Sequence, residues 1–461
     1  MSSPMDLDTA GATETAQAVA RGDVSAIEAC EAAIARIEER DGKINAIVVR
    51  DFERAREAAR ELDRNRVAND TRPLLGVPMT VKESHNVAGL PSSWGFPEFT
   101  GPVDADSVVV SRLKAAGAVI LGKTNVSVAL ADWQSVNPVY GRTCNPFDPG
   151  RVPGGSSGGA AAALAAGMVP LEFGSDIGGS IRIPAHFCGV FGHKPTYGVI
   201  PARGQAFPGT DGVEIPLAVV GPMARSARDL SLALEVTAGP EEGSGYRLDL
   251  PPMRRKRLGE FRVLVLADHP ACETDVSVSG PVRELAAALS ERGVDVRSEA
   301  VGLPDLRGAH DRYMKMLNTI MSRGVPGTET ISAHVWMDLL DHQMRLARQW
   351  RSLFQDIDVV LAPPFGTPAF PHDDEPDWRK RTLPVNGVET PFGRQLAWPG
   401  LATFPGLPAT AVPIATTDRG LPTGVQIVGD RYADRSTIGF ARFLEQAGLT
   451  LNVSADRATC P

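Results

Sequence analysis

The sequence predicts an α/β protein whose β-sheet is largely covered by helices. Short apolar runs, typical of buried strands, alternate with stretches in which apolar residues recur at helical spacing. Such alternation places helices on the faces of a sheet. The chain has 461 residues, of which 43% are hydrophobic and 22% are charged. These values are close to those of soluble globular proteins, so the chain can bury a large core in one domain or in several.

The first part of the chain predicts helices followed by strands. Residues 12–62 are rich in Ala, Glu and Arg and carry apolar residues at helical spacing, which predicts two helices broken around residues 41–42. The texture then changes to short apolar runs. A strand, a helix that ends at a glycine, and a second strand are predicted at residues 74–84, 107–117 and 118–124.

Residues 141–213 are dense in glycine and only weakly periodic, with the runs GGSSGG and GSDIGGS. A long irregular segment in a compact domain is commonly functional or disordered. Residues 160–167 (AAAALAAG) predict a helix within it, which argues against disorder. We therefore expect the active site in this segment.

The second half of the chain begins with a segment typical of a linker or surface excursion, residues 240–260. After it, a strand, a helix and a second strand are predicted at residues 261–270, 281–293 and 294–301, and a mainly helical stretch at residues 308–355. Three further strands are predicted at residues 358–364, 410–415 and 423–429, and a last helix at residues 434–447. The whole chain is consistent with one large α/β domain, to which residues 240–330 are partly an appendage.

Composition argues against several classes of function. The net charge is −8 and the sequence pI is about 5.6, whereas nucleic-acid-binding proteins usually present a basic face. The basic run at residues 254–257 follows two prolines and is typical of a solvated linker. Five scattered cysteines without a C-x-x-C pair indicate a reducing compartment. With no visible signal peptide and no membrane-spanning apolar run, we expect a cytoplasmic protein.

Three motif matches occur in contexts that do not suit them. Residues 117–124 match the P-loop pattern, but the four residues between its glycines predict a buried strand in place of a phosphate-binding loop. Residues 154–158 match the G-x-S-x-G nucleophile elbow, which requires an apolar strand before it, whereas NPFDPGRVP precedes it here. The S-x-x-K match at residues 111–114 lies in an ordinary amphipathic helix.

Histidines offer an alternative catalytic base. His85, His186 and His193 fall near the glycine-rich core, so a Ser–His dyad remains open, although packing or hydrogen-bonding roles are favoured for all three. No H-x-x-x-H or similar spacing is present. No metal and no other cofactor is therefore expected.

Three segments together contain the parts that acyl transfer requires. They surround Lys82 (GVPMTVKES), Ser156 and Ser157 (PGGSSGG), and Ser180 (GSDIGGSIRIPAHFCG). Acyl transfer needs an activated nucleophile, a proton carrier for the leaving group and donors for the oxyanion. A lysine can be the base when it is neutral, and burial lowers its pKa. The apolar run before Lys82 can carry that side chain inward.

The DIGG stretch before Ser180 predicts an oxyanion hole. Glycines allow successive backbone N–H groups to turn toward one point without obstruction by a Cβ atom. The donors expected are the N–H groups of Ile177, Gly178, Gly179 and Ser180.

At these residues the sequence resembles the amidase-signature family. The family hallmarks are GGSSGG, a later GSDxGGSIRxPA and a preceding GVPxxxK[DE], and here they stand at residues 154–159, 174–185 and 76–83. The similarity covers most of residues 70–235 and reappears near the C-terminus. It implies one α/β/α domain over residues 1–461 around a twisted mixed sheet. The N-terminal helices are expected at residues 1–65 and the signature core at residues 70–235. A linker with an appendage is expected at residues 240–330, and a C-terminal part that completes the sheet and the pocket at residues 331–461.

The resemblance also implies a Ser–Ser–Lys triad that contains no histidine. Ser180 would be the acylated nucleophile, and Ser156, which follows an unusual cis peptide bond in the family, would bridge it to Lys82. Lys82 would be the base, and the relay would return the proton to the departing amine. The supporting residues implied are Ser157, hydrogen-bonded near the lysine, and Asp176 and Arg182, which would brace the loops.

The activity implied is hydrolysis of a linear amide to a carboxylate and ammonia or an amine, through a seryl acyl-enzyme. We expect a small apolar or aryl amide as the substrate and leave a homodimer open. The alternative is an A-type glutamyl-tRNA amidotransferase subunit, which releases ammonia from glutamine inside a complex. Those subunits usually carry F-x-SSLDQ-x-GP where this chain has FPGTDGVEIPLAVVGP (207–222), which favours a stand-alone enzyme. The candidate pocket residues are Leu130, Trp133, Gln134, Phe207, Trp398 and Phe404.

Overall fold

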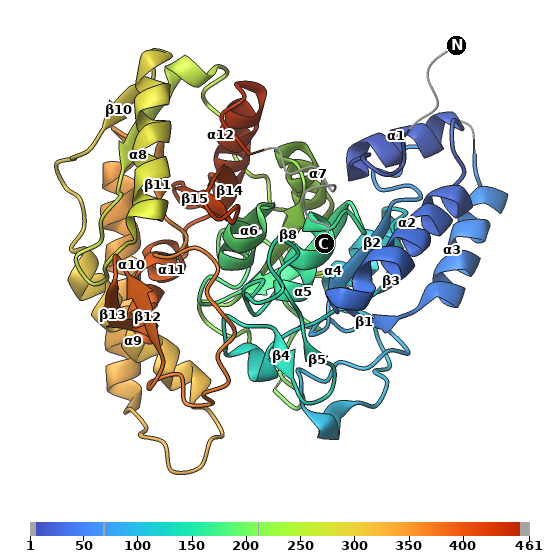
Figure 1. Cartoon of the computed structure of the whole chain (residues 1–461), viewed down its shortest axis with the longest axis horizontal. Coiled ribbons are helices and arrows are strands. Elements are labelled where there is room, and N and C mark those ends of the chain that lie inside the picture. Colours follow the sequence, from blue (N-terminus) through green and yellow to red (C-terminus); the bar gives the residue numbers. More distant parts are fainter. Residues whose placement is uncertain (1–5, 68–69, 211, 452–461) are drawn as a thin grey trace.

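The computed structural model describes residues 6–67, 70–210 and 212–451, and in these residues eleven strands form one mixed sheet (Figure 1). The sheet contains, in spatial order, β1 (Ile47–Arg50), β3 (Val119–Thr124), β2 (Pro78–Lys82), β6 (Leu171–Asp176), β8 (Val219–Ala224), β7 (Phe191–Lys194), β14 (Ala409–Thr416), β15 (Pro422–Val428), β11 (Val359–Ala362), β9 (Arg262–Val265) and β10 (Asp295–Arg297). Parallel pairing joins β3, β2 and β6 at one side and β11, β9 and β10 at the other. The strands between them pair antiparallel.

Helices cover both faces of the sheet. One face packs against α1 (Ala12–Arg21), α4 (Val108–Ala115), α7 (Ala227–Thr237), α8 (Val276–Glu291) and α12 (Asp434–Gln446). The other packs against α2 (Ala26–Arg40), α3 (Phe52–Arg64), α5 (Gly158–Ala165), α6 (Arg182–Cys188), α9 (Leu306–Met321), α10 (Ala333–Leu353) and α11 (Ala397–Thr403). Figure 1 shows α1–α3 at one end of the molecule and α8–α10 at the other. Two small hairpins, β4 (Val136–Asn137) with β5 (Gly141–Arg142) and β12 (Thr382–Val385) with β13 (Val388–Pro391), lie outside the main sheet.

Alternating side chains divide the core into layers above and below the sheet. In β11, Val359 and Leu361 belong to one hydrophobic cluster, and Val360 and Ala362 belong to the cluster on the opposite face. This follows from the two-residue side-chain period of a strand. Because both faces of this strand are buried, all four of its residues are apolar, as expected for a strand in a covered sheet.

The predicted fold class is confirmed, and most of the predicted elements are present. The strands expected from the sequence correspond to β2, β3, β9, β10, β11, β14 and β15. The P-loop match begins just after α4 and continues as strand β3, with Gly117 in a left-handed conformation (φ 96°). No helix within the described part of the chain is long and apolar enough to cross a lipid bilayer.

Two expectations about local structure are wrong. Residues 12–62 form three helices and the edge strand β1 in place of two helices, because a four-residue strand between Ala- and Arg-rich helices leaves no periodic signal. The glycine-dense segment 141–213 contains β6, α6 and β7 as well as loops. In β6, Gly174 and Ser175 interrupt the apolar pattern, although all six residues of the strand are buried.

The sheet topology places the catalytic candidates at adjacent strand ends. Strands β2 and β6 are parallel neighbours, with Thr80 opposite Glu172. Their carboxyl ends therefore meet at one edge of the sheet, which is where open α/β sheets bind ligands. Lys82 is the last residue of β2, and the loop that leads to Ser180 begins where β6 ends.

Because both faces of the sheet are buried, shortening a side chain in an interior strand should lower the stability of the protein strongly. Leu361 in β11 is fully buried, so Leu361→Ala should lower the free energy of unfolding by about 2–5 kcal/mol through lost burial and a cavity. Urea denaturation followed by circular dichroism measures this. The control Val301→Ala, at a fully exposed position, should change stability by no more than roughly 0.5 kcal/mol. Equal effects of the two substitutions would contradict the assignment of Leu361 to the core.

Candidate active site

The Lys82 ammonium group lies in a fully buried polar contact at the end of β2. Its Nζ atom is 2.7 Å from Ser156 Oγ and 2.9 Å from Ser175 Oγ. Burial lowers the pKa of Lys82 to about 7, although the nearby carboxylates of Asp176 and Glu172 oppose that shift. A substantial neutral fraction therefore exists near neutral pH, and a neutral amine can accept a proton from a hydroxyl group.

Ser156 and Ser157 stand at the start of α5 and join two other segments. The Gly155–Ser156 peptide bond is cis. Ser157 N donates to Ser180 O at 3.2 Å. The Ser157 hydroxyl donates to Ser175 O at 3.3 Å and accepts from Ser175 N at 3.4 Å. Ser157 thus binds the backbone of Ser175, whose own hydroxyl contacts Lys82, and the structure gathers all three segments around the lysine.

Two residues of this polar cluster were not identified from the sequence. Ser175 Oγ contacts Lys82, and Gln205 Nε2 donates both to Ser175 Oγ and to Ser84 Oγ, each at 3.1 Å. Ser175 lies inside the recognised GSDIGG run, but only the pairing of β2 with β6 shows that it reaches the lysine. Gln205 belongs to a loop without periodicity, so no sequence signal places it here.

Asp176 organises the loop that carries Ser180. Its carboxylate accepts the N–H groups of Gly179 at 2.9 Å and of Ile181 at 3.1 Å. The Gly179 N–H is therefore directed at Asp176, although the sequence predicted it as one of four oxyanion donors. Among the described residues, the N–H groups of Ile177, Gly178 and Ser180 have no hydrogen-bond acceptor.

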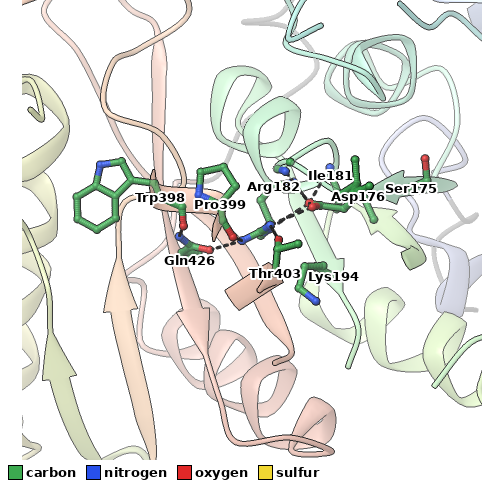
Figure 2. A network of polar contacts seen from close by, with 12 residues as sticks. Ser175, Asp176, Ile181, Arg182, Lys194, Trp398, Pro399, Thr403 and Gln426 are labelled. Carbon is green, nitrogen blue, oxygen red and sulfur yellow. Dashed lines mark hydrogen bonds and ion pairs between the residues drawn. The ribbon is translucent and has the colours of Figure 1, made fainter. Parts of the chain in front are cut away.

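Asp176 is held in turn by a fully buried ion pair with Arg182 (Figure 2). Arg182 Nη2 and Nε lie 2.9 and 3.0 Å from the two carboxylate oxygens. Burial alone would raise the pKa of Asp176, but the Arg182 charge outweighs it and holds that pKa at about 2. The remaining donors of the guanidinium group reach three acceptors in the C-terminal part of the chain, Pro399 O, Gln426 Oε1 and Thr403 Oγ1.

Lys194 adds a further charge centre beside this pair (Figure 2). It is fully buried at the end of β7, and its Nζ atom donates to Pro195 O at 2.9 Å. Burial, followed by the neighbouring Arg182 charge, lowers the pKa of Lys194 to about 7, against the opposing effect of Asp176. Glu172 is also fully buried, and burial raises its pKa to about 7.

The three histidines near the glycine-rich segment have partners other than Ser156 and Ser180. His193 contacts Thr410 and Asp434, and His186 contacts Thr367 O and the N–H of Gly424. Burial lowers the pKa of His186 to about 4 and that of His85 to about 3. Across the described residues, no group of three or more His, Cys, Asp or Glu side chains is suited to holding a metal ion.

The six candidate pocket residues fall into two groups. Leu130 and Phe207 are half-buried, and Trp133 Nε1 donates to Gly178 O at 2.9 Å, in the loop that carries Ser180. Deeper in the molecule, the other three are buried and engaged with protein groups: Gln134 with the backbone of Asp373, Trp398 with the Thr274 hydroxyl, and Phe404 with the ring of Tyr313. The structure therefore brings only Leu130, Trp133 and Phe207 to the neighbourhood of accessible space or of the loop itself.

Comparison with known proteins shows the family of the chain. The family model described as Amidase matches residues 28–325 and 315–438. The chain belongs to the amidase family. It is thus an amidase-family hydrolase, and members of the family act on amides.

Individual relatives of this amidase-family chain are similar over nearly their whole length. Indoleacetamide hydrolase of Bradyrhizobium diazoefficiens is 31% identical, covering 94% of this chain and 86% of that protein. The A-type glutamyl-tRNA(Gln) amidotransferase subunit of a Roseiflexus species is 31% identical, covering 92% and 93%. The crystal structure of a bacterial aryl acylamidase of the amidase signature family superposes with a TM-score of 0.81 at 26% identity, covering 98% of this chain and 99% of that one.

The buried ion pair predicts a strongly destabilising single substitution. Arg182→Met leaves the Asp176 carboxylate buried without its counter-charge, so the free energy of unfolding should fall by about 3–5 kcal/mol. Chemical denaturation measures the loss. The double substitution Asp176→Asn with Arg182→Met should recover part of it, because neither member of the pair is then left as a buried charge without its partner. Arg345→Met, which breaks an exposed pair with Asp341, is the matched control and should have little effect. A loss no larger than that of the control would contradict the assigned role.

Proposed function

We propose that this protein hydrolyses a linear carboxylic amide through a seryl acyl-enzyme, with Ser180 as nucleophile, Ser156 as proton relay and Lys82 as base. The observation that carries the proposal is the 2.7 Å contact between Lys82 Nζ and Ser156 Oγ, in a site whose burial lowers the pKa of the lysine to about 7. A serine hydroxyl needs such a neighbouring base to become an effective nucleophile.

In the proposed reaction, Ser180 Oγ attacks the amide carbon while its proton moves to Ser156 and the Ser156 proton moves to Lys82. The carbonyl oxygen becomes an oxyanion. Collapse breaks the C–N bond, and the relay returns the proton to the departing nitrogen, so that ammonia or an amine leaves. Water then attacks the seryl ester by the same relay and releases the carboxylate. The same two groups, Ser156 and Lys82, therefore act first as base and then as acid, as general acid–base catalysis permits.

The oxyanion is proposed to bind the N–H groups of Ile177, Gly178 and Ser180. Among the described residues, these three N–H groups have no protein acceptor. The Gly179 N–H, the fourth donor expected from the sequence, donates to Asp176. Donors held in place before the reaction lower the barrier because no reorganisation is needed as charge develops.

For the substrate, we propose an apolar or aryl amide. An aromatic cluster supports this choice: Phe207 makes edge contacts with Trp94, Phe96 and Phe99 at centroid distances of 5.8, 5.5 and 5.7 Å. The segment before Leu130 joins the cluster, since Ala129 N donates to Trp94 O at 2.9 Å. Phe207 lies two residues after Gln205 in the sequence, and Gln205 donates to Ser175 Oγ. The aromatic cluster is therefore close along the chain to the polar site around Lys82.

A second candidate is an A-type glutamyl-tRNA amidotransferase subunit, which is favoured by the 31% identity to one such protein over most of the chain. The stand-alone enzyme is preferred because residues 207–222 lack the SSLDQ stretch usual in those subunits. A panel of aryl, indolyl and aliphatic amides and glutamine, assayed by product release from the purified chain alone, distinguishes the two. Release of ammonia from glutamine only in the presence of partner subunits would favour the second candidate.

Removing the nucleophile should abolish turnover. Ser180→Ala is expected to lower kcat by at least about 10³-fold, and Ser156→Ala and Lys82→Ala should be nearly as damaging because members of one relay act as a unit. Steady-state kinetics on the best amide of the panel measures the loss. Ser111→Ala, at an exposed serine of α4, is the matched control and should retain wild-type activity. Wild-type kcat in Ser180→Ala would refute the mechanism.

Activity should rise with pH near neutrality. The pKa of Lys82 is lowered to about 7, so the base is protonated and inactive below this pH and neutral above it. The pH profile of kcat/KM should therefore increase through about pH 7 and reach a plateau. Because Lys194 also has a pKa of about 7, Lys194→Met serves as the control, and its profile should keep the same midpoint whatever its rate. A flat wild-type profile between about pH 5 and 9 would exclude Lys82 as the base.

A further inference from the structure

Two aromatic side chains hold consecutive carbonyl groups of the loop before Ser180. The Tyr313 hydroxyl donates to Ile177 O at 2.9 Å, and Trp133 Nε1 donates to Gly178 O at 2.9 Å. Tyr313 belongs to α9 and is fully buried. The loop is thus fixed by groups that lie outside the glycine-rich segment itself.

Peptide geometry turns each of these contacts into a constraint on the next residue. A peptide unit is planar, and in its trans form the C=O and N–H groups point in opposite directions. In the described residues the cis bond is the one before Ser156, so the 177–178 and 178–179 units are trans. A donor fixed on one carbonyl group therefore sets the direction of the following N–H group.

The 178–179 unit illustrates the rule within this structure. Trp133 holds its C=O at 2.9 Å, and on the opposite side its N–H, that of Gly179, reaches Asp176 Oδ1 at 2.9 Å. In the 177–178 unit Tyr313 holds the C=O in the same way. Its N–H, that of Gly178, has no acceptor among the described residues and is left for a ligand.

We propose that Tyr313 is a positioning residue that aims the Gly178 N–H at the oxyanion of the acylation step. The inference rests on the proposed function and extends it to a residue outside the glycine-rich segment. Without the tyrosine hydroxyl, the Ile177 carbonyl loses its partner, and the 177–178 unit can rotate. The oxyanion would then meet a donor that must first be reoriented.

The surroundings of Tyr313 suit it to this role. A Cβ atom added at Gly400 in α11 would lie 2.6 Å from Tyr313 Cδ1, so the ring is packed closely against that helix. Phe404 lies beside the ring at a centroid distance of 6.4 Å. Burial, with the nearby Asp176 charge, raises the pKa of the Tyr313 hydroxyl, so the group remains a donor over the working pH range.

The test is Tyr313→Phe, which keeps the ring and removes the hydroxyl. We expect kcat to fall by about 10- to 100-fold, which is less than the fall caused by removing a direct oxyanion donor. KM should change by less than about threefold. Affinity for an arylboronic acid, whose adduct with Ser180 mimics the tetrahedral intermediate, should weaken by a similar factor. Affinity for the carboxylate product should fall by a smaller factor, because the planar carboxylate shares its charge between two oxygen atoms and is not a tetrahedral adduct with Ser180.

Matched variants separate this role from a structural one. All proteins are assayed well below the lowest of their melting temperatures. Tyr246→Phe, at an exposed tyrosine, should match the wild type. Placing 3-fluorotyrosine at position 313 retains the hydroxyl and should restore kcat and boronate affinity. Equal weakening of boronate and product binding, or no restoration by 3-fluorotyrosine, would show a merely structural role and overturn the inference.

Comparing Ser180→Ala with Tyr313→Phe shows whether the proposed role of Tyr313 or the proposed function itself is wrong. If Ser180→Ala is inactive and Tyr313→Phe has wild-type kcat and boronate affinity, the inference alone is wrong. If Ser180→Ala keeps wild-type activity, both the acyl-enzyme and the role of Tyr313 are excluded. Boronate binding requires no turnover and is measured by calorimetry, so the comparison does not depend on the choice of amide.

Discussion

The geometry of the site depends on the buried ion pair between Asp176 and Arg182. Each partner also binds groups beyond the pair. Asp176 accepts two N–H groups of the loop that carries Ser180, and Arg182 donates to acceptors on α11 and β15. A buried charge pair is tolerated only when its remaining hydrogen-bonding capacity is satisfied. Two of the groups that satisfy it here are N–H groups of the loop that carries Ser180, so the ion pair and the conformation of that loop depend on each other.

The chemistry of Lys82 follows from a different constraint, the pairing of two parallel strands. Because β2 and β6 are neighbours, their ends bring a lysine and the Ser175 hydroxyl together inside the protein. Burial there lowers the pKa of the amine, and the contacts with Ser156 and Ser175 keep it hydrogen-bonded. The sheet therefore supplies the burial and the Ser175 hydroxyl, and the glycine-rich loop before α5 supplies Ser156.

Local patterns in the sequence predicted the fold class, the covered sheet and the segments around Lys82, Ser156 and Ser180. They could not predict contacts that depend on long-range packing. Tyr313 reaches the loop from α9, more than a hundred residues downstream, and Trp398 and Phe404 carry no mark that separates a core aromatic from a pocket wall. The direction of the Gly179 N–H likewise depends on where the Asp176 carboxylate lies, which a glycine-rich motif does not specify.

The distribution of the network along the chain has a consequence for biosynthesis. Lys82, Ser156 and Ser180 all lie in the first half of the chain, whereas the acceptors of Arg182 come from residues 399–426. A nascent chain that has been synthesised only as far as α9 thus contains these three residues and Tyr313 but still lacks the acceptors that bind Arg182. The complete set of contacts around Arg182 can therefore form only after residue 426 has been synthesised.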